Sequence, residues 1–208
     1  KFKILKKKRK WAAFQGYSTG KSVFVQPKKT EQAHMTIGFP GLNTGHPDYF
    51  AMKLLGVALG GNMSSRMFLN IREAQGLCYY INSTMDDFTD CGHFTTNAGV
   101  DVNRVDQAVS SIVKEYAKLY QNPHLDKKEL EKSKAYLYGK LVISLEDSEE
   151  VAHLIGKQAI LNEGIKTLDV IHEMIHKVTV DDVARVAKQI IDPSKMKLAY
   201  IGPERSIE

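Results

Sequence analysis

Strand patterns and helix patterns are grouped along this chain instead of alternating. Apolar-rich runs typical of strands lie at 22–26, 32–39, 77–85, 91–100 and 195–201. Between the last two runs, the apolar residues recur only with helical periodicity. Because the strands and the helices are clustered, we expect an α+β fold of two layers, a mixed and mainly antiparallel sheet covered on one face by helices.

Capping residues and glycines mark where the expected helices begin and end. A buried helix covers residues 48–59 and stops at Gly60-Gly61, and a second helix stops at Gly76. The residues expected to cap this second helix and the later ones are Ser64, Asn103, Asp126, Ser148, Thr167 and Thr179. Pro193 marks the end of the last helix.

The net charge of +5 is confined to one end of the sequence. Residues 1–10 hold seven basic residues and no acidic one, and the rest of the 208 residues carry 22 basic against 24 acidic side chains. We therefore interpret residues 1–20 as a basic arm or linker remnant and 21–208 as one domain, with an arm for an anionic partner as the alternative. A nucleic-acid-binding face is therefore not expected. No apolar run in the sequence approaches the roughly 20 residues that a membrane-spanning helix needs.

The two cysteines, Cys78 and Cys91, are too few for a disulfide framework or a metal cluster. If residues 77–86 pair with 91–100 as a hairpin, Cys78 lies opposite a residue near Ala98 and not opposite Cys91. We expect two free thiols, a reducing compartment and hence a cytoplasmic protein.

A His-Glu-x-x-His pattern at 172–176 is a possible zinc motif. On a helix, two histidines at i and i+4 share a face and can bind one zinc ion while the glutamate activates water. The apolar stripe of the expected helix, however, leaves His172 and His176 on a flank that faces solvent. Glu204, the candidate third ligand, lies in a terminal tail. We expect a surface helix; a zinc peptidase using His172, Glu173 and His176, or adventitious metal binding, is the alternative.

Residues 59–80, LGGNMSSRMFLNIREAQGLCYY, form a more specific signal. A helix that ends at Gly76 presents Arg72, and the strand that follows carries Tyr79. A guanidinium and a phenol that converge on one spot can hold a peptide carbonyl and stabilise an oxyanion. The alternative is structural, because arginine complements the dipole at a helix C-terminus and tyrosine favours strands.

The ordered stretch from GLNTGHPDYF to REAQGLCYYI resembles the signature of the second domain in pitrilysin/insulinase-family zinc peptidases. The resemblance continues through VTVDDVARVAKQI to the closing strand KLAYIGP, and it covers nearly the whole chain after about residue 20. It implies the fold of the processing peptidases, in which two similar halves enclose a chamber where peptides are hydrolysed.

The same resemblance assigns roles to residues. One half of such enzymes carries zinc on an inverted His-x-x-Glu-His motif, which this sequence lacks. The other half supplies an arginine and a tyrosine that contact the substrate near the metal, and the seven-residue spacing matches Arg72 and Tyr79. Both are therefore expected to be catalytic and substrate-binding residues, and Tyr80 is a further substrate-binding candidate.

The resemblance also implies a partner and a cofactor. We expect this chain to be the C-terminal, substrate-binding half of a zinc metalloendopeptidase, with zinc in a partner half or subunit and a peptide as substrate. By itself the chain should bind no stoichiometric zinc and should be inactive. A non-catalytic scaffold or partner subunit of the same family is the alternative.

Overall fold

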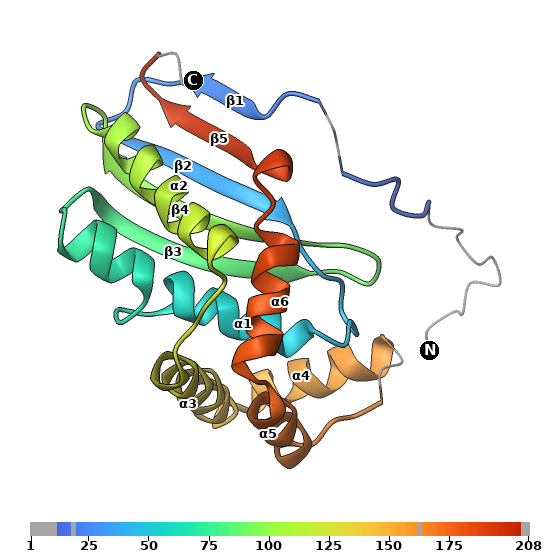
Figure 1. Cartoon of the computed structure of the whole chain (residues 1–208). Helices are drawn as coiled ribbons and strands as arrows, with labels where there is room; N and C mark the ends of the chain where they lie inside the picture. The colour runs from blue at the N-terminus through green and yellow to red at the C-terminus, as the bar shows by residue number, and fades with distance from the viewer. Residues whose placement is uncertain (1–11, 18–19, 162–163, 205–208) are drawn as a thin grey trace.

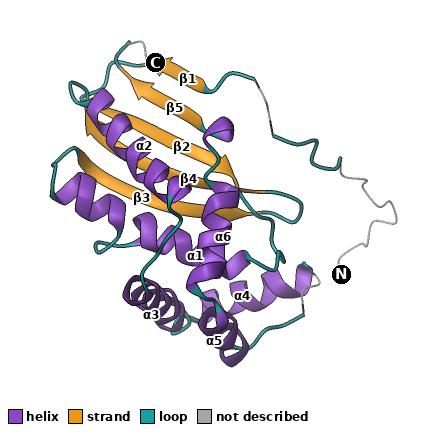
Figure 2. Cartoon of the chain, viewed as in Figure 1, coloured by secondary structure: helices purple, strands orange, loops and turns teal. Residues whose placement is uncertain are grey.

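The sheet has the mixed, mainly antiparallel organisation that the sequence predicts (Figure 2). The computed structural model describes residues 12–17, 20–161 and 164–204. The strands are β1 (Val23–Pro27), β2 (Gln32–Pro40), β3 (Cys78–Asp87), β4 (Gly92–Asp101) and β5 (Lys197–Gly202). Their order across the sheet is β1-β5-β2-β4-β3; β1 and β5 are parallel, and the other neighbours are antiparallel.

The helices form two groups (Figure 1). Those against the sheet are α1 (Tyr49–Gly56), α2 (Val105–Gln121) and α6 (Val180–Ile190). Those farther from the sheet, beyond α1, are α3 (Lys127–Ser144), α4 (Ser148–Ile160) and α5 (Leu168–Lys177). Two π-helical turns, η1 (Val57–Gly61) and η2 (Phe68–Glu73), connect α1 to β3, and a short 3-10 turn, η3 (Pro193–Lys195), precedes β5. No described helix is both long enough and apolar enough to span a membrane.

One face of the sheet is covered and the other is open, which confirms the two-layer expectation. Strand residues that face the helices are fully or nearly fully buried: Met35, Ile37, Phe94, Leu198 and Tyr200. Residues that alternate with them remain exposed or half-buried on the other face: His34, Thr36, Tyr80, Asn82, Thr95 and Asn97. This two-residue alternation assigns the apolar side of each strand to the helical layer.

Half of the predicted N-terminal caps are confirmed. The side chains of Asp126, Thr167 and Thr179 accept hydrogen bonds from Glu129, Val170 and Asp182 backbone N–H groups. Thr179 and Asp182 form a complete capping box. In each case the oxygen-bearing side chain lies one residue before the first helical turn.

The other three predicted caps are wrong, because a neighbouring side chain takes the role or no side chain does. Asp147 caps α4 one residue before Ser148. Asn62 accepts a hydrogen bond from the Ser64 N–H at 2.8 Å, so that Ser64 belongs to a turn. Arg104, and not Asn103, occupies the N-cap position of α2, with no side-chain cap bond. Asp101 engages the Asn103 N–H instead, at 2.7 Å.

Gly60 has a role beyond ending a helix. A Cβ atom at this position would lie 2.4 Å from the backbone nitrogen of Ser83, so only glycine lets η1 approach β3 this closely. The helix continues through Gly60 as a π-helical turn and ends at Gly61.

The β3–β4 register separates the two cysteines. Cys78 pairs with Val100, two residues beyond the predicted Ala98, and Cys91 lies next to Gly92 at the opposite end of the ladder. Nine strand residues at about 3.3 Å each place the two cysteines roughly 30 Å apart. Both thiols are free.

The basic run at residues 1–10 lies outside the described residues. Part of the arm that follows it contacts the turn between β3 and β4. The Phe14 N–H donates to the Asp90 carboxylate at 3.1 Å, and the Tyr17 hydroxyl bonds to the backbone of Gly92.

Candidate functional site

The turn between η2 and β3 has a defined helix-end geometry. Gly76 has φ of +57°, and its N–H donates to the Arg72 carbonyl at 3.0 Å. The Leu77 N–H donates to the Ile71 carbonyl at 3.1 Å, and the side chains of Leu77 and Ile71 are both buried. The bond from the Gly76 N–H to the Arg72 carbonyl, made around a left-handed glycine, is the αL motif of a helix end. It fixes the direction in which the chain leaves Arg72 and enters β3.

A second arginine holds this turn from the helix side. The Arg104 guanidinium donates to the carbonyl oxygens of Gln75 and Gly76, each at 3.0 Å. Arg104 lies at the start of α2, 28 residues from Gly76 in the sequence. The role of Arg104 is not predictable from the sequence, because no local pattern indicates which backbone carbonyls its guanidinium contacts.

Arg72 is exposed at the last turn of η2. Its guanidinium carbon lies 4.9 Å from the centroid of the Phe68 ring, a cation–π contact that orients the side chain. Within the described part of the chain, no carboxylate lies within ion-pair distance of this guanidinium. Its donors are therefore available to a ligand.

Tyr79 occupies a β-bulge at the start of edge strand β3. Cys78 pairs with Val100 and Tyr80 pairs with Gly99, which leaves Tyr79 as the extra residue. The Tyr79 side chain is 56% exposed, and its hydroxyl has no hydrogen-bond partner among the described residues. A bulge re-aims a side chain relative to the regular alternation of a strand, and Tyr79 is the residue that this bulge displaces.

Tyr80 differs from Tyr79 because its hydroxyl already has a partner. It lies 3.0 Å from Nδ1 of His34, and the two rings are stacked with centroids 6.0 Å apart. The Tyr80 ring also covers Gly99, where a Cβ atom would lie 2.4 Å from it. Tyr80 is thus fixed on the open face of the sheet, whereas Tyr79 is free at its edge.

The Cys78 thiol, which lies between Arg72 and Tyr79 in the sequence, is influenced by the charges of both Arg72 and Arg104. Burial raises the pKa of Cys78 to about 11, while the positive charges of Arg104 and Arg72 act in the opposite direction. Arg72 is therefore near enough to influence the residue before Tyr79. No hydrogen bond or ring contact joins Arg72 directly to Tyr79 or Tyr80 in the described structure.

The His-Glu-x-x-His segment lies on α5, with both histidines and Glu173 exposed. The His172 and His176 rings are stacked 5.8 Å apart, and Glu173 forms an ion pair with Lys177 at 3.3 Å. Over residues 12–17, 20–161 and 164–204, no group of three or more His, Cys, Asp or Glu side chains is placed to hold a metal ion. The described residues therefore do not fit a zinc site.

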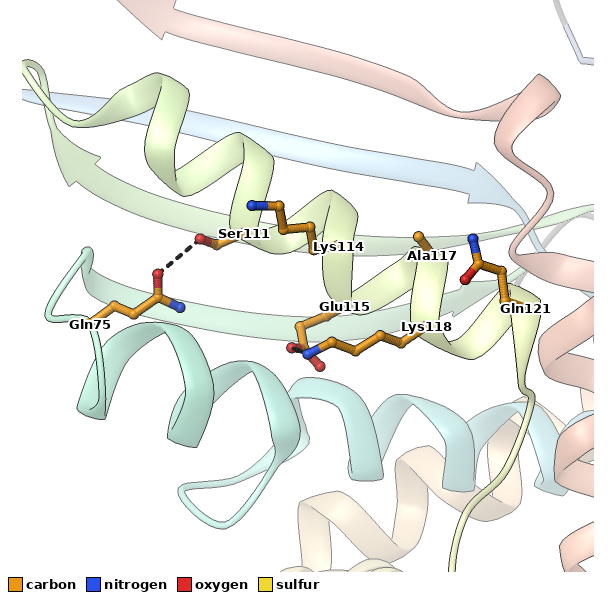
Figure 3. Close-up of a pocket in the computed structure, with 7 residues that line it drawn as sticks. All are labelled: Gln75, Ser111, Lys114, Glu115, Ala117, Lys118 and Gln121. Carbon is orange, nitrogen blue, oxygen red and sulfur yellow. Dashed lines mark hydrogen bonds and ion pairs between the residues drawn. The ribbon is translucent and has the colours of Figure 1, made fainter.

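Three surface cavities accompany this arrangement, and Arg72, Tyr79 and Tyr80 line none of these three. One, of about 470 Å³, lies along α2 and is lined largely by polar side chains (Figure 3). There the Ser111 hydroxyl donates to the Gln75 side chain at 3.0 Å, and Lys118 pairs with Glu115 at 2.5 Å. The expectation that Arg72 and Tyr79 face a common concavity stays a prediction.

Residues 3–137 match the family model described as the peptidase M16 inactive domain. The chain is 35% identical over 179 residues to a Bacillus subtilis protein named uncharacterized zinc protease YmxG, covering 86% of this chain and 43% of that protein. It is also 35% identical over 176 residues to an uncharacterized zinc protease of Streptomyces coelicolor, covering 85% of this chain and 38% of that protein. The chain thus spans about two fifths of the length of these relatives.

Solved structures share the fold. A conserved protein from Enterococcus faecalis has a TM-score of 0.79 at 20% identity, covering 93% of this chain and 44% of the other. A peptidase M16 inactive domain from Pseudomonas fluorescens also has a TM-score of 0.79, at 21% identity, covering 89% of this chain and 44% of the other.

Proposed function

Since this chain belongs to the M16 peptidase family, as an inactive domain of a family of zinc proteases, we propose that it is the substrate-binding half of a zinc metalloendopeptidase. In this proposal a partner half, covalently attached or separate, carries the zinc ion. The two halves enclose the peptide, and Arg72 and Tyr79 contact it near the scissile bond.

The observation that carries the proposal is the pair of unpartnered donors on either side of Gly76. The turn at Gly76 and the two hydrogen bonds from Arg104 hold the backbone between Arg72 and Tyr79 in place. Both side chains nevertheless remain exposed, without an acidic partner for Arg72 or an acceptor for Tyr79 among the described residues. Fixed backbone and free donors are the conditions for preorganised recognition of a carbonyl group.

The chemistry of these two groups fits a peptide bond during hydrolysis. A guanidinium donates hydrogen bonds, and a phenol can donate one through its O–H group. Two donors directed at the carbonyl oxygen of the peptide favour negative charge on that oxygen. Such bonds strengthen as the carbonyl oxygen becomes an oxyanion, and therefore lower the barrier. Tyr80 is assigned to binding of the peptide, because His34 already engages its hydroxyl.

The face of the sheet that the helices leave open is suited to form one wall of the proposed chamber. It carries polar side chains joined by cross-strand bonds, such as Thr36 to Asn97 at 2.8 Å and Thr84 to Thr95 at 3.1 Å. Among the described residues, no helix covers this face, whereas the opposite face is buried under the helices.

Zinc belongs to the partner half in this proposal. The described residues of this chain offer no ligand set for it, and the sequence has no His-x-x-Glu-His segment. Each relative extends well beyond the region that this chain matches, which leaves room for a second half there.

The test is peptide cleavage by the chain combined with its zinc-bearing half. Tyr79→Phe removes one donor and should lower kcat by about 10²–10³-fold. Arg72→Ala should mainly raise KM if the guanidinium binds substrate and transition state equally, and lower kcat if it acts on the oxyanion. Tyr120→Phe, which changes an exposed tyrosine on α2, is the matched control and should leave both constants unchanged.

Near-normal kcat/KM for Tyr79→Phe, with the fold intact by circular dichroism, would remove the catalytic role and favour a non-catalytic scaffold. Hydrolysis by the 208-residue chain alone, lost in His172→Ala, would instead support the independent zinc peptidase.

A further inference from the structure

An apolar cavity of about 360 Å³ lies between the α1 side of the sheet layer and the outer helices. Side chains from α1, α3, α4 and α5 line it, together with the loop at residues 44–47. The apolar part of its wall includes Phe50, Leu137, Leu141, Leu154, Leu161 and Met174. Its volume is within the range of small-molecule sites, which are mostly apolar with a few placed polar groups.

Lys53 on α1 brings a cation to this apolar wall. Its Nζ lies 4.9 Å from the centroid of the Tyr49 ring. In the described residues, no hydrogen-bond acceptor or carboxylate lies within bonding distance of this Nζ. Burial lowers the pKa of Lys53, and the nearby Lys157 adds to this, while Asp87 opposes it. A half-buried ammonium without a direct anionic partner is open to an anionic ligand.

Asp87, the carboxylate with the largest electrostatic effect on Lys53, already has several hydrogen-bond and ion-pair partners. It accepts hydrogen bonds from the hydroxyls of Thr44 at 2.8 Å and Tyr49 at 3.3 Å, and it pairs with Lys157 at 3.3 Å. Burial alone would raise the pKa of Asp87, but the Thr44 bond and the charges of Lys53 and Lys157 hold it below its usual value. Two ammonium groups, those of Lys53 and Lys157, therefore face this one carboxylate, and a third lysine, Lys166, also lines the cavity.

We infer that this cavity is a binding site for a monocarboxylate with a linear acyl tail of medium length. The carboxylate lies against Lys53 and Lys157, and the tail occupies the apolar volume between α3 and α4. A cation is disfavoured by the two ammonium groups, and a neutral hydrocarbon leaves Lys53 unsatisfied. The site is separate from the Arg72–Tyr79 region, so the inference does not depend on the proposed function.

The packing of α4 is compatible with tails of different length. Only Gln158 is buried among the residues of α4, and this side chain accepts a hydrogen bond from the Lys166 N–H at 2.8 Å. A helix with so little buried surface can shift at low cost as the cavity fills.

The experiment measures binding of decanoate to the 208-residue chain by calorimetry at neutral pH. Affinity should rise about fourfold per added methylene from hexanoate to decanoate, until the cavity is full. Decanol and decylamine, which keep the tail and change the head, should bind at least about tenfold more weakly, as expected for loss of a charged hydrogen bond. A methyl NMR signal of Met174, in the cavity wall, should shift, and that of the exposed Met63 should not.

Three variants localise the site. Lys53→Met should weaken decanoate at least about tenfold while leaving decanol unchanged. Leu141→Trp, which fills the cavity, should weaken both ligands. Lys114→Met, at an exposed lysine on α2, should weaken neither.

Equal affinities for decanoate, decanol and decylamine, or an unchanged decanoate affinity in Lys53→Met, would overturn the proposal. Stronger binding of a short peptide with a C-terminal leucine than of decanoate, lost in Lys53→Met, would also overturn it and assign the cavity to peptide C-termini.

Discussion

The helices that lie against the sheet and the outer helices α3, α4 and α5 differ in how they are held. In α1, five of eight residues are buried, and Leu54 and Leu55 are wholly inaccessible to solvent. In α4, one of thirteen residues is buried, and that residue is polar. The sheet layer is thus stabilised by close apolar packing, whereas α4 depends on its cap, ion pairs and partial burial, and α3 and α5 contribute only Leu130, Ile171 and Ile175 to the buried apolar core. An apolar cavity can persist only where packing is incomplete, and it lies between these two regions.

Matched leucine truncations test this difference most strongly. Leu55→Ala should destabilise the chain by about 2.7–5 kcal/mol, because it removes buried surface and leaves a hole in a tight core. Leu154→Ala on α4, which enlarges an existing cavity, should cost about 1 kcal/mol or less. Urea unfolding of both variants measures the gap, and equal losses would show that α4 is packed as tightly as α1.

Glycine-to-alanine changes should have opposite signs in the two regions. Gly60→Ala places a Cβ atom against the Ser83 backbone and should cost about 1–3 kcal/mol. Gly156→Ala on α4 meets no atom within 4 Å and should stabilise by about 0.5–1 kcal/mol. Thermal unfolding of each variant is the measurement. A destabilising Gly156→Ala would mean that α4 has a contact outside the described residues.

The ion pair between Arg66 and Glu129 is one of the contacts that join the two regions, and its strength can be measured. Arg66, just before η2, donates to both carboxylate oxygens of Glu129 on α3, at 2.6 and 2.7 Å, and to the His124 carbonyl at 2.8 Å. We expect a coupling free energy of about 1 kcal/mol, at the upper end for partly exposed pairs, because the contact is bidentate. A double-mutant cycle with Arg66→Met and Glu129→Gln measures this coupling, and a value near zero would show that this ion pair does not contribute to the attachment of α3.

The smallest expected effect is the loss of the stability contributed by Asp87 when the pH is lowered. The folded-state pKa of Asp87 is held below the unfolded value of 3.8, so the unfolded chain binds this proton first as the pH falls. Its contribution to stability is present above pH 3.8 and is lost as the pH falls through the lower folded-state pKa. In Asp87→Asn this loss should be absent, a difference of about 0–1 kcal/mol in the unfolding free energies measured between pH 5 and 3. Parallel pH profiles for the two proteins would contradict the role assigned to Asp87.

The site illustrates which features a sequence reveals. The ordered stretch from Gly41 to Ile81 indicates the family, and the match to the M16 inactive domain confirms it. The spacing across Gly76 selected Arg72 and Tyr79, whose exposure is consistent with the proposed role. Arg104 was not predicted, because its contacts with Gln75 and Gly76 join segments 28 and 29 residues apart.

The sequence by itself determined the order of strands and helices, the apolar face of each strand and three of the six predicted caps. These features depend on residues within about four positions of one another, so local periodicity and local hydrogen bonding suffice to predict them. Only the tertiary structure decided that Gly60 packs against Ser83, that a bulge isolates Tyr79, and that Lys53, Lys157 and Asp87 line the same apolar cavity. Each of these depends on strand register or helix packing between distant segments, which is set by the whole core.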